Sequence, residues 1–254
     1  TSPGYLKVND RVITEDYTNL GEVDISTILA KSSNVGSAII GLGLEENQLW
    51  SSLSNFGFGR LTGVGLQGES AGIFNIPQNW NPTSQATLSY GYGLSVTPLQ
   101  LAQAYSVIAN RGMMKSVSIL SSDIASSPKR IISEKTANHV IKMMEGVVSP
   151  GGTGTLASVK NYRVAGKTGT AKKSESGSYT DDKYTSVFAG FAPASEPQFA
   201  IVVVIDEPNA TSYYGGEVAA PIFSKVMDGA LRISSIRPDG IEMTTQNKIA
   251  KVSK

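Results

Sequence analysis

The sequence predicts an α+β fold, an antiparallel sheet flanked by helices, because two hydrophobic patterns follow one another along the chain. Apolar residues recur at helical spacing through much of the first 150 residues. Strand-like runs follow at 162–172, 185–193 and 199–206, joined by turn-forming segments as in an antiparallel meander. With 254 residues and 40% hydrophobic content, the chain is long enough to bury the core of one large domain.

Local signals mark where the helices begin and end. Asp24 is a suitable N-cap, and Thr97, Pro98 and Gln100 form a capping box with proline in the first turn. Gly57 provides a C-terminal stop. The expected helices, in chain order, span 25–31, 35–42, 45–56, 98–112, 133–148 and 217–233.

Other segments are expected to lack helices. The polar first twenty residues contain one possible short strand at 5–8, and 57–82 is a glycine- and proline-rich loop. Residues 90–93 alternate tyrosine and glycine, which is typical of a packed turn or of the lining of a groove. A buried face is expected on the helix that begins at Pro98, formed by Leu101, Ala104, Tyr105 and Ile108.

Composition excludes several classes of function. A formal net charge of +1 and the absence of a Lys/Arg block argue against a nucleic-acid partner. The chain has no cysteine and one histidine, which excludes thiolate zinc sites, cysteine nucleophiles and histidine-rich metal sites, so no metal or cofactor is expected. His139 lies off the apolar stripe of its helix and is expected at the surface. No apolar run is long enough to cross a bilayer.

Residues 162–171 form a β-like run that is suited to holding an anion. Thr168 and Thr170 lie two apart, so their hydroxyls project to one side of a strand while Lys167 points to the other side or along the edge. Two glycines in the same run allow close approach to the backbone. A carboxylate along this edge could accept from both hydroxyls and feel the ammonium group, although a plain edge strand would share the pattern.

A second short motif precedes this strand. Ser32 and Asn34 form the only Ser-x-Asn of the chain, and they lie at the junction between two expected helices. Serine β-lactamases and penicillin-binding proteins carry Ser-x-x-Lys, Ser-x-Asn and Lys-Thr-Gly in that order. The second and third of these motifs are present here in the same order.

The whole chain resembles a class B penicillin-binding protein, the monofunctional peptidoglycan D,D-transpeptidase, and most closely the division-specific septal enzyme of Gram-negative bacteria. The likeness runs over 1–236, the expected transpeptidase domain, and leaves 237–254 as a flexible tail. It implies a penicillin-binding/β-lactamase-like fold with a larger all-helical lobe. The stretches that carry it are Lys31-Ser32-Ser33-Asn34-Val35-Gly36, Leu88-Ser89-Tyr90-Gly91-Tyr92-Gly93-Leu94, Pro98-Leu99-Gln100-Leu101-Ala102, Pro150-Gly151-Gly152-Thr153-Gly154 and Tyr213-Tyr214-Gly215-Gly216.

The resemblance implies a role for each motif residue. Ser32 would move a proton toward the leaving group, and Asn34 would bond the substrate amide and orient the family's catalytic lysine. Lys167 would supply positive potential, while Thr168 and Thr170 would bind the substrate carboxylate and the Thr170 N–H would serve the oxyanion hole. The other expected substrate-binding residues are Ser33, Gly169, Tyr90, Tyr92, Tyr213 and Tyr214.

One family motif is missing from its expected place. The only Ser-x-x-Lys runs from Ser126 to Lys129, downstream of Ser-x-Asn and in a proline-bearing segment, which is the wrong position for the acylated serine. We therefore expect the nucleophile to lie upstream of Thr1. The chain is then incomplete at its N-terminal side, needs the N-terminal part of the same protein, and is inactive alone.

The resemblance also implies partners and a location. Stem peptides of peptidoglycan would be the substrates, β-lactams would acylate the same serine, and a septal glycosyltransferase and other cell-division proteins would assemble with the enzyme. The expected location is the periplasmic side of the bacterial inner membrane. Two alternatives remain open: a β-lactamase or D,D-carboxypeptidase type of hydrolase, in which water resolves the acyl-enzyme, and a catalytically inactive ligand-binding piece.

Overall fold

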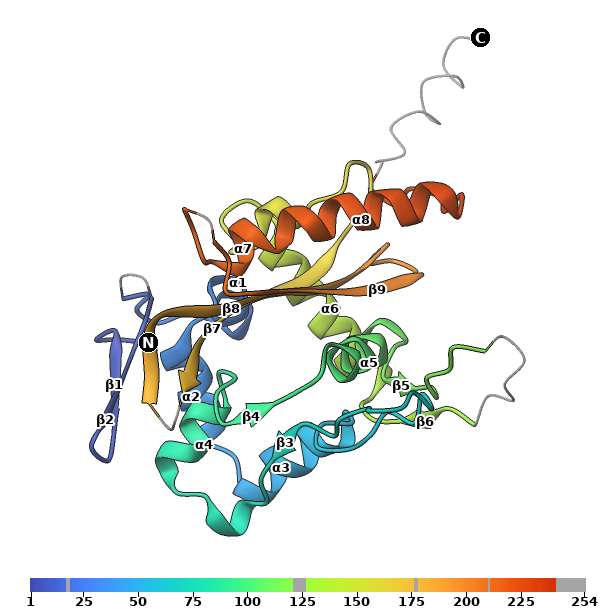
Figure 1. The fold of residues 1–254 in the computed structure, drawn as a ribbon. Coiled ribbons are helices and arrows are strands. Elements are labelled where there is room, and N and C mark those ends of the chain that lie inside the picture. The colour runs from blue at the N-terminus through green and yellow to red at the C-terminus, as the bar shows by residue number, and fades with distance from the viewer. Residues whose placement is uncertain (17–18, 121–126, 176–177, 210, 241–254) are drawn as a thin grey trace.

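The computed structural model describes residues 1–16, 19–120, 127–175, 178–209 and 211–240 (Figure 1). Its main sheet has three antiparallel strands in the order β7-β8-β9, which confirms the predicted meander. The strands of this sheet are β7 Ala165–Glu175, β8 Ser178–Ala192 and β9 Phe199–Asp206. Three two-stranded sheets accompany it: β1 Tyr5–Val8 with β2 Arg11–Thr14, β3 Ile73–Phe74 with β4 Leu94–Ser95, and β5 Met113–Met114 with β6 Lys129–Arg130.

The helices follow the predicted ones closely in the first part of the chain. Asp24 caps its helix by accepting from the Thr27 N–H at 2.8 Å, and both bonds of the Thr97–Gln100 capping box are formed. The helices are α1 Ile25–Lys31, α2 Asn34–Leu42, α3 Glu46–Asn55, α4 Pro82–Leu88, α5 Pro98–Ala109, α6 Glu134–Val148, α7 Gly215–Val218 and α8 Ala220–Ile233, with 3-10 turns at Pro77–Asn79 and Thr155–Ala157.

The buried face of α5 is wider than the predicted one. Ala104 is buried as expected, and Tyr105 and Ile108 are partly buried and pack against a core cluster. Gln100, which was not part of the expected stripe, is fully buried as well. The Gln100 amide donates to the carbonyl oxygens of Arg60 (2.7 Å) and Ala71 (2.8 Å), which satisfies its polar atoms inside the protein. This glutamine thereby ties the long 57–82 segment to α5.

Two further expectations are corrected. Helix α4 begins at the end of the segment expected to be a loop, where Asn81 caps it by accepting from the Ser84 N–H at 2.8 Å. The last helix, expected over 217–233, is divided at Ala219, and its first part, α7, begins at Gly215. A Cβ at Gly215 would meet the Gly169 carbonyl oxygen at 2.3 Å, so glycine lets α7 lie directly on the backbone of β7.

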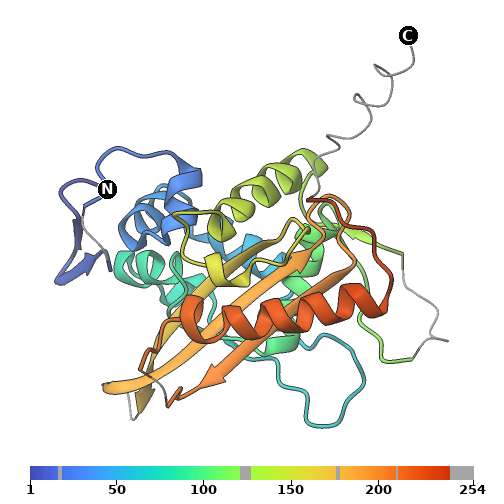
Figure 2. The same ribbon diagram turned by 90° about the horizontal axis from the view of Figure 1, so that it is seen from above.

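The two faces of the main sheet pack against different helices. Helix α8 lies along one face, and α5 and α6 lie on the other (Figures 1 and 2). The α8 face buries Phe188 of β8 with Phe223, and their ring centroids are 4.7 Å apart. The opposite face buries Ala165 and Phe191 among residues of α6. Alternate residues of β7 therefore point to different neighbours.

Residues beyond the expected domain boundary at 236 are bonded to the segments that precede β7 and follow β8. The Asp239 carboxylate accepts from the Arg163 N–H at 2.7 Å and from the Ser195 hydroxyl at 2.7 Å. The Gly240 N–H donates to the carbonyl oxygen of Asn161 at 2.9 Å. The ordered part of the domain thus reaches at least residue 240, while 241–254 lie outside the described residues.

Within the described ranges, no helix combines the length and the apolarity that crossing a membrane requires. Ser126 of the downstream Ser-x-x-Lys lies outside the described residues, as do Ser176 and Gly177 of the expected turn between β7 and β8. Lys129 begins the exposed strand β6, and His139 is exposed on α6, as predicted.

Candidate active site

The structure brings the Ser-x-Asn junction and the Lys-Thr-Gly strand together. Lys167 Nζ donates to Ser32 Oγ at 2.7 Å, although the two residues are 135 positions apart in the chain. The same ammonium group donates to the Thr168 carbonyl oxygen at 3.1 Å and lies 3.5 Å from Thr168 Oγ1. Helix α1 delivers the serine and β7 delivers the lysine.

Ser32 has a strained backbone. It follows α1 directly and adopts φ 57° and ψ 46°, the left-handed conformation that favours glycine. The next residue, Ser33, is already the N-cap of α2, so the two helices follow one another without a connecting loop. A serine in this conformation costs about 1–2 kcal/mol relative to a right-handed one. Strain of this kind gathers at functional sites, where a side chain must be presented in a fixed direction.

Lys167 carries a charge that burial disfavours. Burial lowers the pKa of its ammonium group from 10.5 to about 8. Among the described residues, no carboxylate forms an ion pair with it, and its bonds go to neutral oxygens of Ser32 and Thr168. A desolvated cation without a counter-charge is stabilised by an anion that enters the site. The arrangement can therefore bind a carboxylate.

The hydroxyls of Thr168 and Thr170 lie on the face of β7 that meets α7, as the alternation of side chains predicts. Thr168 Oγ1 shares a hydrogen bond of 2.8 Å with Thr153 Oγ1, and Thr170 Oγ1 accepts from the Gly215 N–H at 3.0 Å. Because the Thr170 oxygen accepts in this bond, its own proton is left to donate. The backbone N–H of Thr153 also donates to the Ala30 carbonyl oxygen at 3.2 Å, which connects the end of α1 to β7.

A carboxylate that sequence reasoning missed supports the Ser-x-Asn motif. Glu15 accepts from the Ser33 hydroxyl and from the Asn34 N–H, the latter at 2.9 Å. The Asn34 side chain donates to the Thr14 carbonyl oxygen at 3.3 Å and makes no direct bond to Lys167. Nothing in the polar first twenty residues distinguishes Glu15 from its neighbours. Its role follows from packing between distant segments.

Ser33 does not fit the expected substrate contact. Only 2% of its surface is exposed, and its hydroxyl accepts from the Gly36 N–H at 2.8 Å while donating to Glu15. The side chain is therefore used inside the protein as the cap of α2. Ser33 positions Ser32 and Asn34 and has no surface left for a ligand.

The four expected tyrosines gather at the far end of β7. Tyr92 Oη accepts from the Lys172 N–H at 3.2 Å. The Tyr90 ring packs edge-on against the Tyr92 ring, with 5.8 Å between their centroids. Tyr213 stacks on Tyr184, and the centroids of these two rings are 3.9 Å apart. Tyr184 was not among the expected site residues; it lies on β8 opposite Lys172 of β7. Tyr214 packs against Tyr213 in turn, at 4.7 Å. This cluster lies about five strand residues, or about 17 Å, from Lys167.

Comparison with known proteins agrees with this geometry. The model of the penicillin binding protein transpeptidase domain matches residues 1–228. Peptidoglycan D,D-transpeptidase FtsI of Escherichia coli K12 is 42% identical over 234 residues, which is 92% of this chain and 40% of the relative. The probable peptidoglycan D,D-transpeptidase PenA of Neisseria meningitidis is 39% identical over 246 residues, again 92% of this chain and 42% of the relative.

Solved structures show the same fold. The apo TP domain of Burkholderia pseudomallei penicillin-binding protein 3 has a TM-score of 0.87 and 37% identity, and the match covers 93% of this chain and 72% of that one. A chain described as a peptidoglycan glycosyltransferase from Burkholderia ambifaria has a TM-score of 0.83 and 35% identity, with 93% and 71% covered. The chain spans about two fifths of the curated relatives it matches. From the match over residues 1–228 and these identities, the chain belongs to the family of penicillin-binding protein transpeptidase domains.

Proposed function

We propose that this chain forms the carboxylate-binding and proton-transfer side of a serine-type peptidoglycan D,D-transpeptidase, and that the acylated serine is supplied from outside residues 1–254. The observation that carries the proposal is the 2.7 Å contact between Ser32 Oγ and the desolvated Lys167 ammonium group. The sequence holds no Ser-x-x-Lys ahead of Ser32, so the chain alone does not acylate. The relatives' names support the reaction class.

The substrate carboxylate occupies the anion site. The terminal carboxylate of a stem peptide pairs with Lys167 and accepts from the hydroxyls of Thr168 and Thr170 at the edge of β7. Charge-assisted bonds of this kind are roughly twice as strong as neutral ones. Because β7 has no described strand on its outer side, an extended peptide can lie along it as an added strand.

Ser32 then moves a proton. Its oxygen accepts from Lys167, so its own proton is free to pass to the leaving amine while the lysine keeps the oxygen fixed. The serine O–C bond forms as the C–N bond of the terminal residue breaks, and the proton that this serine loses replaces the one that Ser32 gives to the leaving amine. The amino group of a neighbouring stem peptide then attacks the acyl-enzyme. Its new C–N bond forms as the serine O–C bond breaks, and the proton that the amine loses returns through Ser32 to the released serine oxygen. β-Lactams carry a carboxylate next to a reactive amide and acylate the same serine.

The proposal extends to where the enzyme works and with which proteins. The cross-linking of stem peptides takes place outside the cytoplasm, so the domain acts on the periplasmic side of the inner membrane. Its partners are the N-terminal part of the same protein, a septal glycosyltransferase and other cell-division proteins. These partners are the ones that the family resemblance implies, and the relatives' printed name, peptidoglycan D,D-transpeptidase FtsI, supports the reaction itself.

Labelling of the full-length gene product with a fluorescent penicillin tests the function. We expect Lys167→Met to slow covalent labelling at least a hundredfold, because the charge that holds the carboxylate is lost. The matched control is Lys135→Met, which removes an exposed lysine near the start of α6 and should label at the wild-type rate. Labelling of Lys167→Met at the wild-type rate would overturn the proposal. Rapid release of the label would instead favour a hydrolase.

A further inference from the structure

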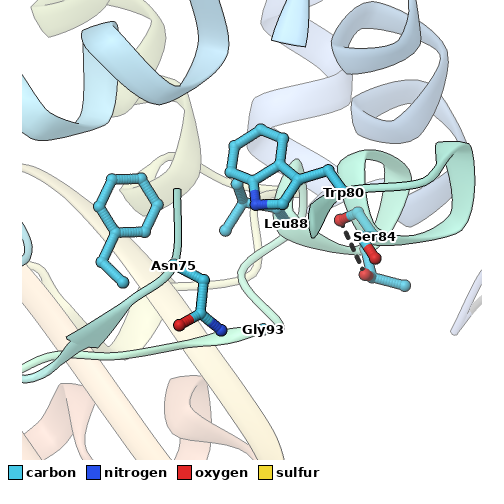
Figure 3. Close-up of a pocket in the computed structure, with 7 residues that line it drawn as sticks. Asn75, Trp80, Ser84, Leu88 and Gly93 are labelled. Carbon is cyan, nitrogen blue, oxygen red and sulfur yellow. Dashed lines mark hydrogen bonds between the residues drawn. The ribbon is translucent and has the colours of Figure 1, made fainter. Parts of the chain in front are cut away.

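A pocket of about 200 Å³ lies beside the paired strands β3 and β4 and helix α4, and its lining does not include Ser32 or Lys167 (Figure 3). None of its lining side chains is ionisable at pH 7, so it is not built for phosphate or another anion. A pocket of this size suits one small ring rather than a long peptide segment. The lining residues are Phe74, Asn75, Trp80, Ser84, Thr87, Leu88 and Gly93.

Aromatic faces form the walls of this pocket. The rings of Phe74 and Trp80 have centroids 6.5 Å apart and are tilted by 52°. Phe74 is backed by Trp50, whose ring lies nearly parallel at 6.2 Å between centroids. The three rings are held by one another and by α3, which carries Trp50, so the walls are already in place before a ligand arrives.

Polar groups complete the lining. Among the described residues, the Asn75 side-chain amide has no hydrogen-bond partner, and the residue is exposed. The Ser84 and Thr87 hydroxyls donate to Asn81 Oδ1 (3.1 Å) and to the Ser84 carbonyl oxygen (3.0 Å), which leaves both hydroxyl oxygens able to accept. An aromatic wall combined with a free amide and accepting hydroxyls fits a ligand with an apolar ring face and polar substituents at its rim.

The pocket is connected to the far end of β7. Gly93 lines it, and the preceding Tyr92 bonds to the Lys172 N–H at 3.2 Å. Lys172 lies about 17 Å along the strand from Lys167. An extended stem peptide of about five residues has the same span. A peptide whose carboxylate lies at Lys167, running antiparallel to β7, therefore brings its N-terminal end, where the sugar is attached, to this side of the domain.

We propose that this pocket binds one N-acetylated amino-sugar ring of the glycan strand that carries the stem peptide. The inference rests on the proposed function, because that function supplies a glycan-linked substrate. The ring stacks on Trp80, and its acetamido group pairs with the Asn75 amide, which offers both a donor and an acceptor. The subsite thereby favours donors that are still attached to glycan over free peptides.

Fluorine NMR of the full-length gene product, labelled with 5-fluorotryptophan, tests binding directly. Trp50 and Trp80 are the two tryptophans of this chain, and the Trp80→Phe variant assigns the Trp80 signal. Titration with an N-acetylglucosamine tetrasaccharide should shift that signal saturably, with a Kd in the millimolar range expected of a small ligand. A glucose tetrasaccharide should bind at least fivefold more weakly, since it lacks the acetamido group.

Variants of the polar and aromatic lining sharpen this test. Asn75→Leu should raise the Kd for the N-acetylglucosamine tetrasaccharide at least fivefold. The fold should be undisturbed, because Asn75 is exposed and its side chain has no hydrogen bond to the described residues. Gln78→Ala, an exposed neighbour outside the lining, should bind as the wild type does. The subsite would be overturned if the Trp80 signal showed no saturable shift up to a tetrasaccharide concentration of about 10 mM, ten times a millimolar Kd. Equal Kd values for the two tetrasaccharides would overturn it as well.

A kinetic comparison separates the subsite from the proposed function. With matched donors, the wild type should show a KM at least threefold lower for a glycan-linked stem peptide than for the free peptide, and Asn75→Leu should remove that difference. Acylation by penicillin, which has no sugar, should be unchanged in the variant. Equal KM values for the two donors in the wild type would overturn the subsite alone. Failure of the wild type to acylate with penicillin would instead overturn the proposed function.

Discussion

Two regions of the main sheet are built in opposite ways. Between the sheet and α8, Phe188 and Phe223 are fully buried in a cluster of apolar side chains. Next to the end of α1, β7 instead presents a desolvated lysine that bonds a serine in a left-handed conformation. The apolar cluster adds to stability, whereas the buried lysine and the strained serine cost some of it. The difference shows where the domain keeps its chemistry.

Removing a large side chain from the α8 face should have the largest effect on stability. Phe223→Ala deletes a fully buried ring and should lower the free energy of unfolding by about 4 kcal/mol. Ile222→Ala, next to it but 42% exposed, should change it by no more than about 0.5 kcal/mol. Thermal or denaturant unfolding of the full-length gene product measures both. Similar losses in the two variants would contradict the stabilising role of the apolar cluster between the sheet and α8.

The free energy of unfolding should depend on pH through Lys167, in the opposite sense to that of a lysine in a stabilising ion pair. Lys167 has a pKa of about 8 in the folded protein against 10.5 when unfolded, so the unfolded chain binds more protons between these values. Stability should therefore rise as the pH increases from 8 to 10.5. Below pH 8 the cost of burying the charge is fully present and amounts to about 3 kcal/mol.

The variant Lys167→Met isolates this contribution. It should remove the rise in unfolding free energy between pH 8 and 10.5 and should be at least as stable as the wild type at pH 7, because no buried charge remains. Carboxylate binding in the wild type should weaken above pH 8 as the lysine loses its proton. A strongly destabilised Lys167→Met domain at pH 7 would mean that the lysine stabilises the fold.

The strain at Ser32 gives a smaller effect that can be separated from the loss of its hydroxyl. Ser32→Gly and Ser32→Ala both remove the group that bonds Lys167, but only glycine relieves the left-handed conformation. The glycine variant should therefore be more stable than the alanine variant by about 1 kcal/mol. Both should lose penicillin acylation to the same extent. Equal unfolding temperatures would show that the backbone is not strained.

Local sequence signals were sufficient for much of the fold. The Thr97–Gln100 capping box and the Asp24 cap each depend on residues three apart, and the meander depends on strand runs joined by short turns. Helix α4 was missed because its cap, Asn81, and its proline lie in a stretch dominated by loop-forming residues. The division of the last helix at Ala219 accompanies the packing of α7 on the sheet, and Pro221 in the first turn of α8 is the local signal for it.

The site divides in the same way. Ser32 and Lys167 were found because short motifs with a known order contain them, and the alternation along β7 predicted which side each threonine faces. Glu15, Tyr184 and Thr153 were not found, because their partners lie in other segments of the chain. Residues that position a site through contacts between distant segments form no short motif that could be recognised in the sequence.

Thr153 joins the two regions, and its hydroxyl gives the smallest expected effect. Its backbone bonds Ala30 at the end of α1, while its hydroxyl bonds that of Thr168 on β7 at 2.8 Å. When Thr153 donates, the Thr168 proton is left for the substrate carboxylate. Thr153→Val keeps the shape but removes this donor, and should raise KM for a carboxylate-bearing donor about fivefold, or about 1 kcal/mol, with little change in kcat.

Two controls decide whether Thr153 acts through Thr168 or only through packing. Thr153→Ser keeps the hydroxyl and should restore KM to within about twofold of the wild type, because the bond to Thr168 can form again. The methyl ester of the same donor lacks the charged carboxylate, so Thr153→Val should leave its KM unchanged. If the ester and the acid lose affinity equally in Thr153→Val, the residue serves packing between α1 and β7. If Thr153→Val raises KM for the acid and leaves KM for the ester unchanged, Thr153, which connects α1 to β7, also determines how Thr168 binds the substrate carboxylate.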